Sequence, residues 1–105
     1  MKLSTVALSA LGDPTRQEIV RLLAERPLAV NEIAAQLPVT RPAVSKHLRV
    51  LSAAGLVDRR SEGTRNVYRL RSEGLETLRN DLDSLWSSAL QRYRLLAENT
   101  VRRRR

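Results

Sequence analysis

The sequence predicts a mainly helical α+β fold of five helices and one two-stranded hairpin, and three observations support it. Apolar residues recur every three or four positions over much of the chain, which is the period of an amphipathic helix. Aromatic residues make up only 3% of the 105 residues and phenylalanine is absent, so the core must be built from leucine, valine, isoleucine and alanine, which suits packed helices. Residues 56–70, in contrast, have the character of two short strands around a glycine turn.

Two helices are predicted in the first quarter of the chain. Residues 4–11 are small and apolar and predict a short helix that Gly12 ends. Asp13-Pro14 marks the start of the second helix, because the carboxylate can cap it and proline suits the first helical position. This helix is expected to run as far as Arg26, where Pro27 stops it.

The next segment predicts a short link and a third helix. Leu28-Ala29-Val30 is apolar and suits a short link or a small edge strand. The helix is expected from Asn31 to Leu37, because Asn31 is a better chemical cap than Ala29 or Val30. Pro38 should end it.

A fourth helix is expected from Thr40, whose hydroxyl can cap it, to Gly55, which supplies the left-handed residue after its end. Val44, Leu48 and Leu51 form an apolar stripe along it. The other face is basic, and no carboxylate occurs from residue 33 to 57. Such a helix is either an ordinary amphipathic helix with a solvated face or one that lies in a DNA major groove. Its candidate DNA contacts are Thr40, Arg41, Pro42, Ser45, Lys46 and Arg49.

The hairpin should follow directly, with strands at 56–61 and 66–70 and a turn containing Gly63. An isolated hairpin is marginally stable in water, so one side must pack on the helices. Its tip carries Arg60, Arg65 and Asn66, which suit backbone phosphates or a narrow minor groove.

The last predicted helix begins at Ser72, and its apolar positions recur for about six turns. Such a helix has more apolar surface than a small domain covers, which favours a homodimer interface over a helix folded back across its own core. The first helix has surplus apolar side chains too. We therefore expect one domain over 1–101 and a disordered basic tail over 102–105. The candidate interface residues are Val6, Leu8, Leu11, Leu78, Leu82, Leu85, Trp86, Ala89 and Tyr93.

Composition narrows the function. The net charge of +8 favours a polyanionic partner such as nucleic acid. The chain has no cysteine, which excludes disulfides and thiolate chemistry. Neither a signal peptide nor a membrane span is apparent, so a cytoplasmic protein is expected. No catalytic constellation is visible, and an enzyme is not expected.

The order of these elements defines a winged helix-turn-helix, since two short helices joined by a tight turn are followed at once by a hairpin. Three motifs at these spacings resemble the ArsR/SmtB family of bacterial repressors. They are Asp13-Pro14-Thr15-Arg16, the run Ser45-Lys46-His47-Leu48 ending at Leu51, and Ala54-Gly55-Leu56-Val57. The resemblance covers about residues 8–70. It implies a homodimer through the first and last helices, and base-reading positions at Arg41, Pro42, Ser45 and Lys46.

The chain departs from the metal-sensing members of that family. It has no cysteine, and its only histidine is His47. The last helix carries Asp81, Asp83 and Glu98 without a histidine, and carboxylates alone make a poor transition-metal site. No metal and no other cofactor is expected. For His47 two interpretations stay open: a partly packed structural residue, or a contact to phosphate or base.

The sequence therefore predicts a sequence-specific regulator of transcription that binds double-stranded DNA. A dimeric repressor on an inverted-repeat operator is favoured, with half-sites ~34 Å apart or a small multiple of it. The alternatives are a winged-helix module that binds a protein and an RNA-associated basic protein. A small-molecule or protein effector cannot be named from the sequence.

Overall fold

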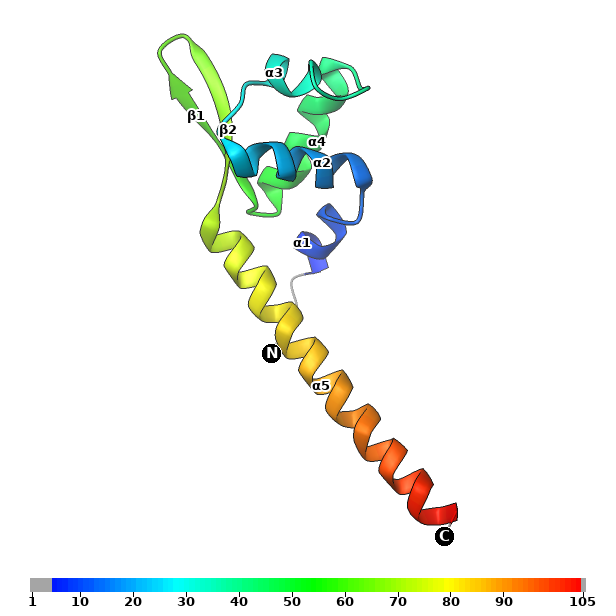
Figure 1. Cartoon of the computed structure of the whole chain (residues 1–105). Coiled ribbons are helices and arrows are strands. Elements are labelled where there is room, and N and C mark those ends of the chain that lie inside the picture. The colour runs from blue at the N-terminus through cyan, green and yellow to red at the C-terminus, as the bar shows by residue number, and fades with distance from the viewer. Residues whose placement is uncertain (1–4, 105) are drawn as a thin grey trace.

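A computed structural model describes residues 5–104, so Ser4 at the start of the first expected helix, and Arg105, lie outside the described residues. The chain forms a small winged domain from which one long helix projects, and its principal extents are 71 × 26 × 21 Å (Figure 1). The elements are α1 (Thr5–Ala10), α2 (Pro14–Glu25), α3 (Val30–Ala34), α4 (Arg41–Ala53), β1 (Val57–Glu62), β2 (Arg65–Leu70) and α5 (Ser72–Arg104).

The helix boundaries follow the capping residues that the sequence predicts at three of these ends. The Asp13 carboxylate accepts the backbone N–H of Arg16 at 3.0 Å and caps α2. The Thr40 hydroxyl accepts the N–H of Ala43 at 3.2 Å and caps α4. Gly55 follows α4 with φ of 77°, a conformation that glycine adopts without strain.

The third helix differs from the prediction, which placed it from Asn31 to Leu37. It begins at Val30, with Ala29 as the residue before it, and ends at Ala34. The reason lies in Glu32, whose carboxylate accepts the backbone N–H of Ala29 at 2.9 Å. Because a side chain inside the helix satisfies that N–H, a polar residue at the cap itself is not needed.

The hairpin is antiparallel, with Val57 opposite Leu70. Each strand reaches one residue further toward the turn than predicted, to Glu62 and Arg65, and β1 begins at Val57 rather than at Leu56. Gly63 forms the turn with φ of 63°. The link before α3 adds one residue to the sheet, since Leu28 exchanges backbone hydrogen bonds with Tyr68 at 3.1 and 2.7 Å. The edge strand considered from the sequence is therefore a single bridge, and it joins the wing to the helical body.

One hydrophobic core is shared by all five helices and the base of the hairpin. Leu78 belongs to it and is only 4% exposed, so this residue of the predicted dimer interface packs inside its own protomer instead. The largest fully buried side chains are Ile19, Leu28, Ile33, Leu48, Leu51, Leu56, Val44 and Val57.

The start of α5 is fixed against the end of α4. A Cβ atom added at Gly74 would overlap the carbonyl oxygen of Gly55 and lie 2.9 Å from its carbonyl carbon. The N–H of Arg71 also donates to the carbonyl of Leu56 at 2.9 Å. Only glycine at position 74 allows this approach, so the long helix leaves the domain at a set point beside α4.

Helix α5 then runs without a break to Arg104. The disordered tail expected from Arg102 is therefore not found over 102–104, where the helix continues. No glycine or proline follows Gly74, arginine is a good helix former, and cations suit a helix C-terminus. Over the described part of the chain, no helix is long and apolar enough to cross a membrane.

Candidate nucleic-acid interface

Helix α4 divides into two faces as the sequence predicts. Val44, Leu48 and Leu51 are completely buried. Arg41, Pro42, Lys46 and Arg49 are exposed on the other side, and Ser45 is half-buried between the faces. The exposed face carries positive charge and short side chains near the helix start, which permits close approach to a phosphate backbone.

The first of these arginines already has a partner within the protein. Arg41 donates from Nη1 to the side-chain carbonyl of Asn31 at 3.1 Å. Asn31 lies at the start of α3, so the first helix of the helix-turn-helix holds a side chain of the second. The Thr40 hydroxyl is engaged in capping, which leaves this residue a structural role at the helix start.

The wing residues predicted from the sequence do not all project the same way. Arg60 pairs with Val67, Ser61 pairs with Asn66, and Glu62 pairs with Arg65 across the hairpin. Because side chains alternate along a strand, Arg60 and Arg65 lie on one face and Asn66 lies on the other. Near the base, Arg69 donates to both carboxylate oxygens of Asp58 at 2.8 and 3.4 Å, which lowers the pKa of Asp58 and raises that of Arg69.

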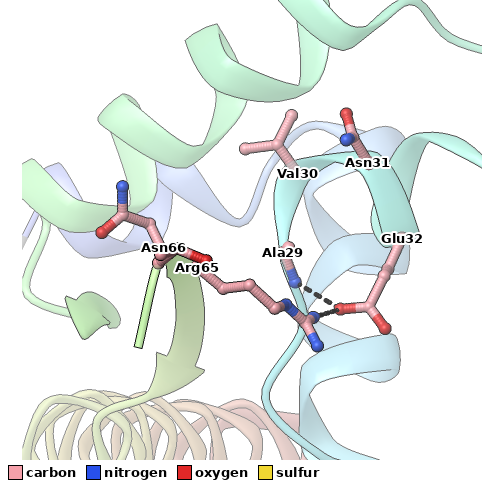
Figure 2. A pocket seen from close by; sticks show the side chains of 7 residues that line it. Ala29, Val30, Asn31, Glu32, Arg65 and Asn66 are labelled. Carbon is pink, nitrogen blue, oxygen red and sulfur yellow. Dashed lines mark hydrogen bonds and ion pairs between the residues drawn. The ribbon is translucent and has the colours of Figure 1, made fainter. Parts of the chain in front are cut away.

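Arg65 reaches from the wing to α3, where its guanidinium forms an ion pair with Glu32 (Figure 2). Arg26 approaches the other carboxylate oxygen of Glu32 at 3.5 Å. The N–H of Ala29, followed by the charges of Arg65 and Arg26, holds the pKa of Glu32 below its ordinary value despite partial desolvation. Ala29, Glu32 and Arg65 border an open groove of about 640 Å³ between the wing and α3.

The His47 side chain is partly buried beside Arg16 and Asp13 and is not presented on the exposed face of α4. Its Nδ1 atom lies 3.3 Å from Nη1 of Arg16 and 4.0 Å from the Asp13 carboxylate, and its side chain is 22% exposed. This geometry favours the structural interpretation of His47. It also depresses the pKa of Asp13, mainly through the Arg16 N–H and further through the Arg16 and His47 charges.

The Arg16 side chain makes contacts that were not predicted from the sequence. It donates from Nε to the carbonyl of Ala10 at 2.5 Å and from Nη2 to that of Ser9 at 3.4 Å. It thus joins the end of α1 to the His47 side chain of α4. The only signal for it was its place in the motif Asp13-Pro14-Thr15-Arg16, which carried no contact information.

The apolar face of α5 has no covering within the protomer beyond its first turns. Trp86 is 68% exposed and Tyr93 is 69% exposed, and Val6 of α1 is 59% exposed. Leu8 and Leu11 are half-buried, and Ala89 is exposed. The helix therefore does not fold back across its own core, and these side chains remain free to meet another molecule. The other large exposed apolar residues of α5 are Leu82, Leu85, Leu90, Leu95, Leu96 and Val101.

Among residues 5–104 no group of three or more histidine, cysteine, aspartate or glutamate side chains is placed to hold a metal ion. Asp81 and Asp83 lie on α5, well outside the groove described above. The only histidine is engaged by Arg16.

A compact helix-turn-helix with an exposed basic second helix and a wing defines the class of winged helix-turn-helix DNA-binding regulators. Comparison with known proteins agrees, since residues 13–59 match the family described as "Bacterial regulatory protein, arsR family". The HTH-type transcriptional regulator Rv2034 of Mycobacterium tuberculosis is 54% identical over 93 residues, which are 89% of this chain and 87% of that protein. The chain therefore belongs to the ArsR family and is a DNA-binding transcriptional regulator, not an enzyme.

Two further relatives show how widely the likeness extends. The arsenical resistance operon repressor of Staphylococcus xylosus is 32% identical over 87 residues, which cover 83% of each chain. The solved structure of an ArsR-like transcriptional regulator from Rhodococcus sp. RHA1 superposes with a TM-score of 0.80 at 29% identity, covering 90% of each chain. The fold thus extends over nearly the whole chain, long helix included.

Proposed function

We propose that this regulator is a homodimeric repressor that acts in the cytoplasm by binding an inverted-repeat operator in double-stranded DNA. The observation that carries the proposal is the outer face of α4, where Arg41, Lys46 and Arg49 are exposed. No carboxylate between residues 33 and 57 opposes the approach of phosphates to this face.

Helix α4 is the recognition helix in this proposal and lies in the major groove. Arg41, Ser45 and Lys46 contact base edges, since arginine pairs well with guanine and short side chains let the helix approach closely. Arg49 binds phosphate, and Arg60, Arg65 and Asn66 of the wing contact the flanking backbone or minor groove. Thr40 and Pro42 shape the helix start that enters the groove.

The dimer forms through α1 and α5, whose exposed apolar side chains would cover one another across a two-fold axis. Two recognition helices would then meet successive major grooves ~34 Å apart, or a small multiple of that distance. Repression follows when the bound dimer occludes a promoter. The regulator does so without a transition metal, because it offers neither thiolates nor a second imidazole.

The decisive experiment is selection of bound genomic fragments at physiological salt, followed by gel-shift titration. We expect an imperfect inverted repeat with an affinity that falls steeply with salt, because bound phosphates release counterions. Arg41→Ala should weaken operator binding by ~1–3 kcal/mol and leave binding to random duplex nearly unchanged. Equal loss on both duplexes would make Arg41 a phosphate contact, and absence of any enriched fragment would contradict the proposed function.

A further inference from the structure

The wing of this protein is held near its tip by one side chain of the helical body. The described residues from Arg59 to Asn66 are all exposed, so the end of the hairpin has little packing of its own. The Leu28–Tyr68 bridge fixes only its base. Val67, next to that bridge, is buried as well. Beyond Val67, toward the turn, the ion pair of Arg65 with Glu32 connects the exposed end of the hairpin to α3 (Figure 2).

Glu32 is itself well fixed. Its carboxylate accepts the N–H of Ala29, and this bond ties the side chain to the backbone at the start of α3. The same bond is the main cause of the lowered pKa of Glu32, which favours the charged form of the carboxylate. A fixed anion of this kind sets the position of a flexible cation beside it.

The ion pair with Glu32 leaves Arg65 able to contact DNA. One guanidinium nitrogen of Arg65 contacts Glu32, whereas a guanidinium has five N–H donors, and the Arg65 side chain remains 56% exposed. Arg26 shares the same carboxylate at 3.5 Å, so two cations accompany one anion and the group keeps a net positive charge. A phosphate is still attracted to it.

We infer that Glu32 is a positioning residue of the DNA interface, which holds Arg65 and the wing in the orientation that meets the DNA backbone. The neighbouring residue behaves in the same way, because Asn31 holds Arg41 at 3.1 Å. Consecutive residues of α3 thus orient one arginine on the recognition helix and one on the wing. This role rests on the proposed function, since it assumes that Arg65 contacts the operator.

The test compares Glu32→Gln, Arg65→Gln and the double variant in the full chain. Glutamine keeps an oxygen that can accept the Ala29 N–H, so α3 should stay capped while the charge that orients Arg65 is lost. The matched control is Glu18→Gln on α2, which also removes one negative charge and breaks an exposed ion pair with Arg21. The probes are a genomic fragment enriched by the wild-type protein and a random duplex of equal length, with thermal melting as a check of folding.

Charge alone predicts that Glu32→Gln binds DNA more tightly, whereas positioning predicts the opposite. We expect operator affinity to fall about two- to tenfold, the scale of ordering one long side chain at an interface. The slope of log K against log salt should also decrease in magnitude by about 0.9, as one phosphate contact is lost. In the Arg65→Gln background the same change should cause no further loss of operator affinity. Glu18→Gln should bind as the wild type does or slightly more tightly.

Two results would overturn the inference about Glu32 alone. Equal or tighter operator binding by Glu32→Gln would show that the carboxylate competes with phosphate for Arg65. A loss of equal size in the Arg65→Gln background would show that Glu32 acts through another route. If the wild-type protein enriches no fragment at all, the proposed function fails and this role of Glu32 fails with it. That outcome is distinguishable from the two results above, which concern Glu32 alone.

Discussion

Replacing Trp86 by alanine should convert the proposed dimer into a monomer at low micromolar concentration. Trp86 is 68% exposed on the apolar face of α5. A tryptophan can bury up to about 250 Å², so ~170 Å² of the Trp86 surface is available for burial at an interface. At about 25 cal/mol per Å² that area corresponds to roughly 4 kcal/mol for each copy.

A symmetric dimer contains two copies of Trp86, which doubles the upper estimate to about 8 kcal/mol. Interfaces realise only part of such an area estimate, because association and side-chain ordering cost free energy. If a third is realised, the dimer dissociation constant rises about 100-fold. Sedimentation equilibrium over a range of protein concentrations measures it directly.

The chain offers a matched control in Leu95, which is 55% exposed and lies nine residues beyond Trp86 on the same helix. Nine residues are about two and a half helical turns, so Leu95 projects from the opposite side. Leu95→Ala should leave the dissociation constant unchanged. An unchanged constant for Trp86→Ala, or an equal loss for Leu95→Ala, would refute the assignment of this face to the dimer.

Three further predictions concern the junction of α5, the cap of α2 and the absence of a metal. Gly74→Ala should lower the free energy of unfolding by ~1–3 kcal/mol in urea titration, because the added Cβ meets the Gly55 carbonyl. Helix propensity alone predicts the opposite, a gain of about 1 kcal/mol. A raised urea midpoint would contradict the predicted loss. The lowered pKa of Asp13 means that its stabilising contribution is full above the ordinary value of 3.8 and is lost as pH falls through the lowered pKa. Asp13→Asn should therefore lose less stability than the wild type on acidification in that range, as followed by circular dichroism, and parallel curves would count against it. Neither zinc nor EDTA should change operator affinity in gel-shift titration, and release of the operator by zinc would show that metal is sensed.

Local chemistry explains why much of the fold was predictable. Asp13, Thr40 and Gly55 act on backbone groups within a few residues of themselves, so each marked its boundary without help from the rest of the chain. The apolar periods of α4 and α5 likewise fixed which sides face inward and which side of α5 stays uncovered. These signals are written in neighbouring positions.

What escaped prediction depends on contacts between distant residues. Arg16 and His47 are 31 positions apart, and Glu32 and Arg65 are 33 apart. Nothing in the sequence around any of these side chains indicates its distant partner. Only the packing of α2 against α4, and of α3 against β2, brings the pairs together. The start of α3 was misplaced for a related reason, because its cap comes from inside the helix at Glu32.

The two junctions of α4 suggest why dimerisation and DNA binding should depend on one another. Near the middle of α4, Arg16 joins the α1 carbonyls to His47 on the recognition helix. Just after the C-terminal end of α4, the close approach of Gly74 to Gly55 fixes where α5 leaves the domain. Both helices of the proposed dimer interface are thus attached directly to the recognition helix, with little intervening structure. A change in how two protomers meet would therefore alter the spacing of their recognition helices, and with it the fit to two half-sites.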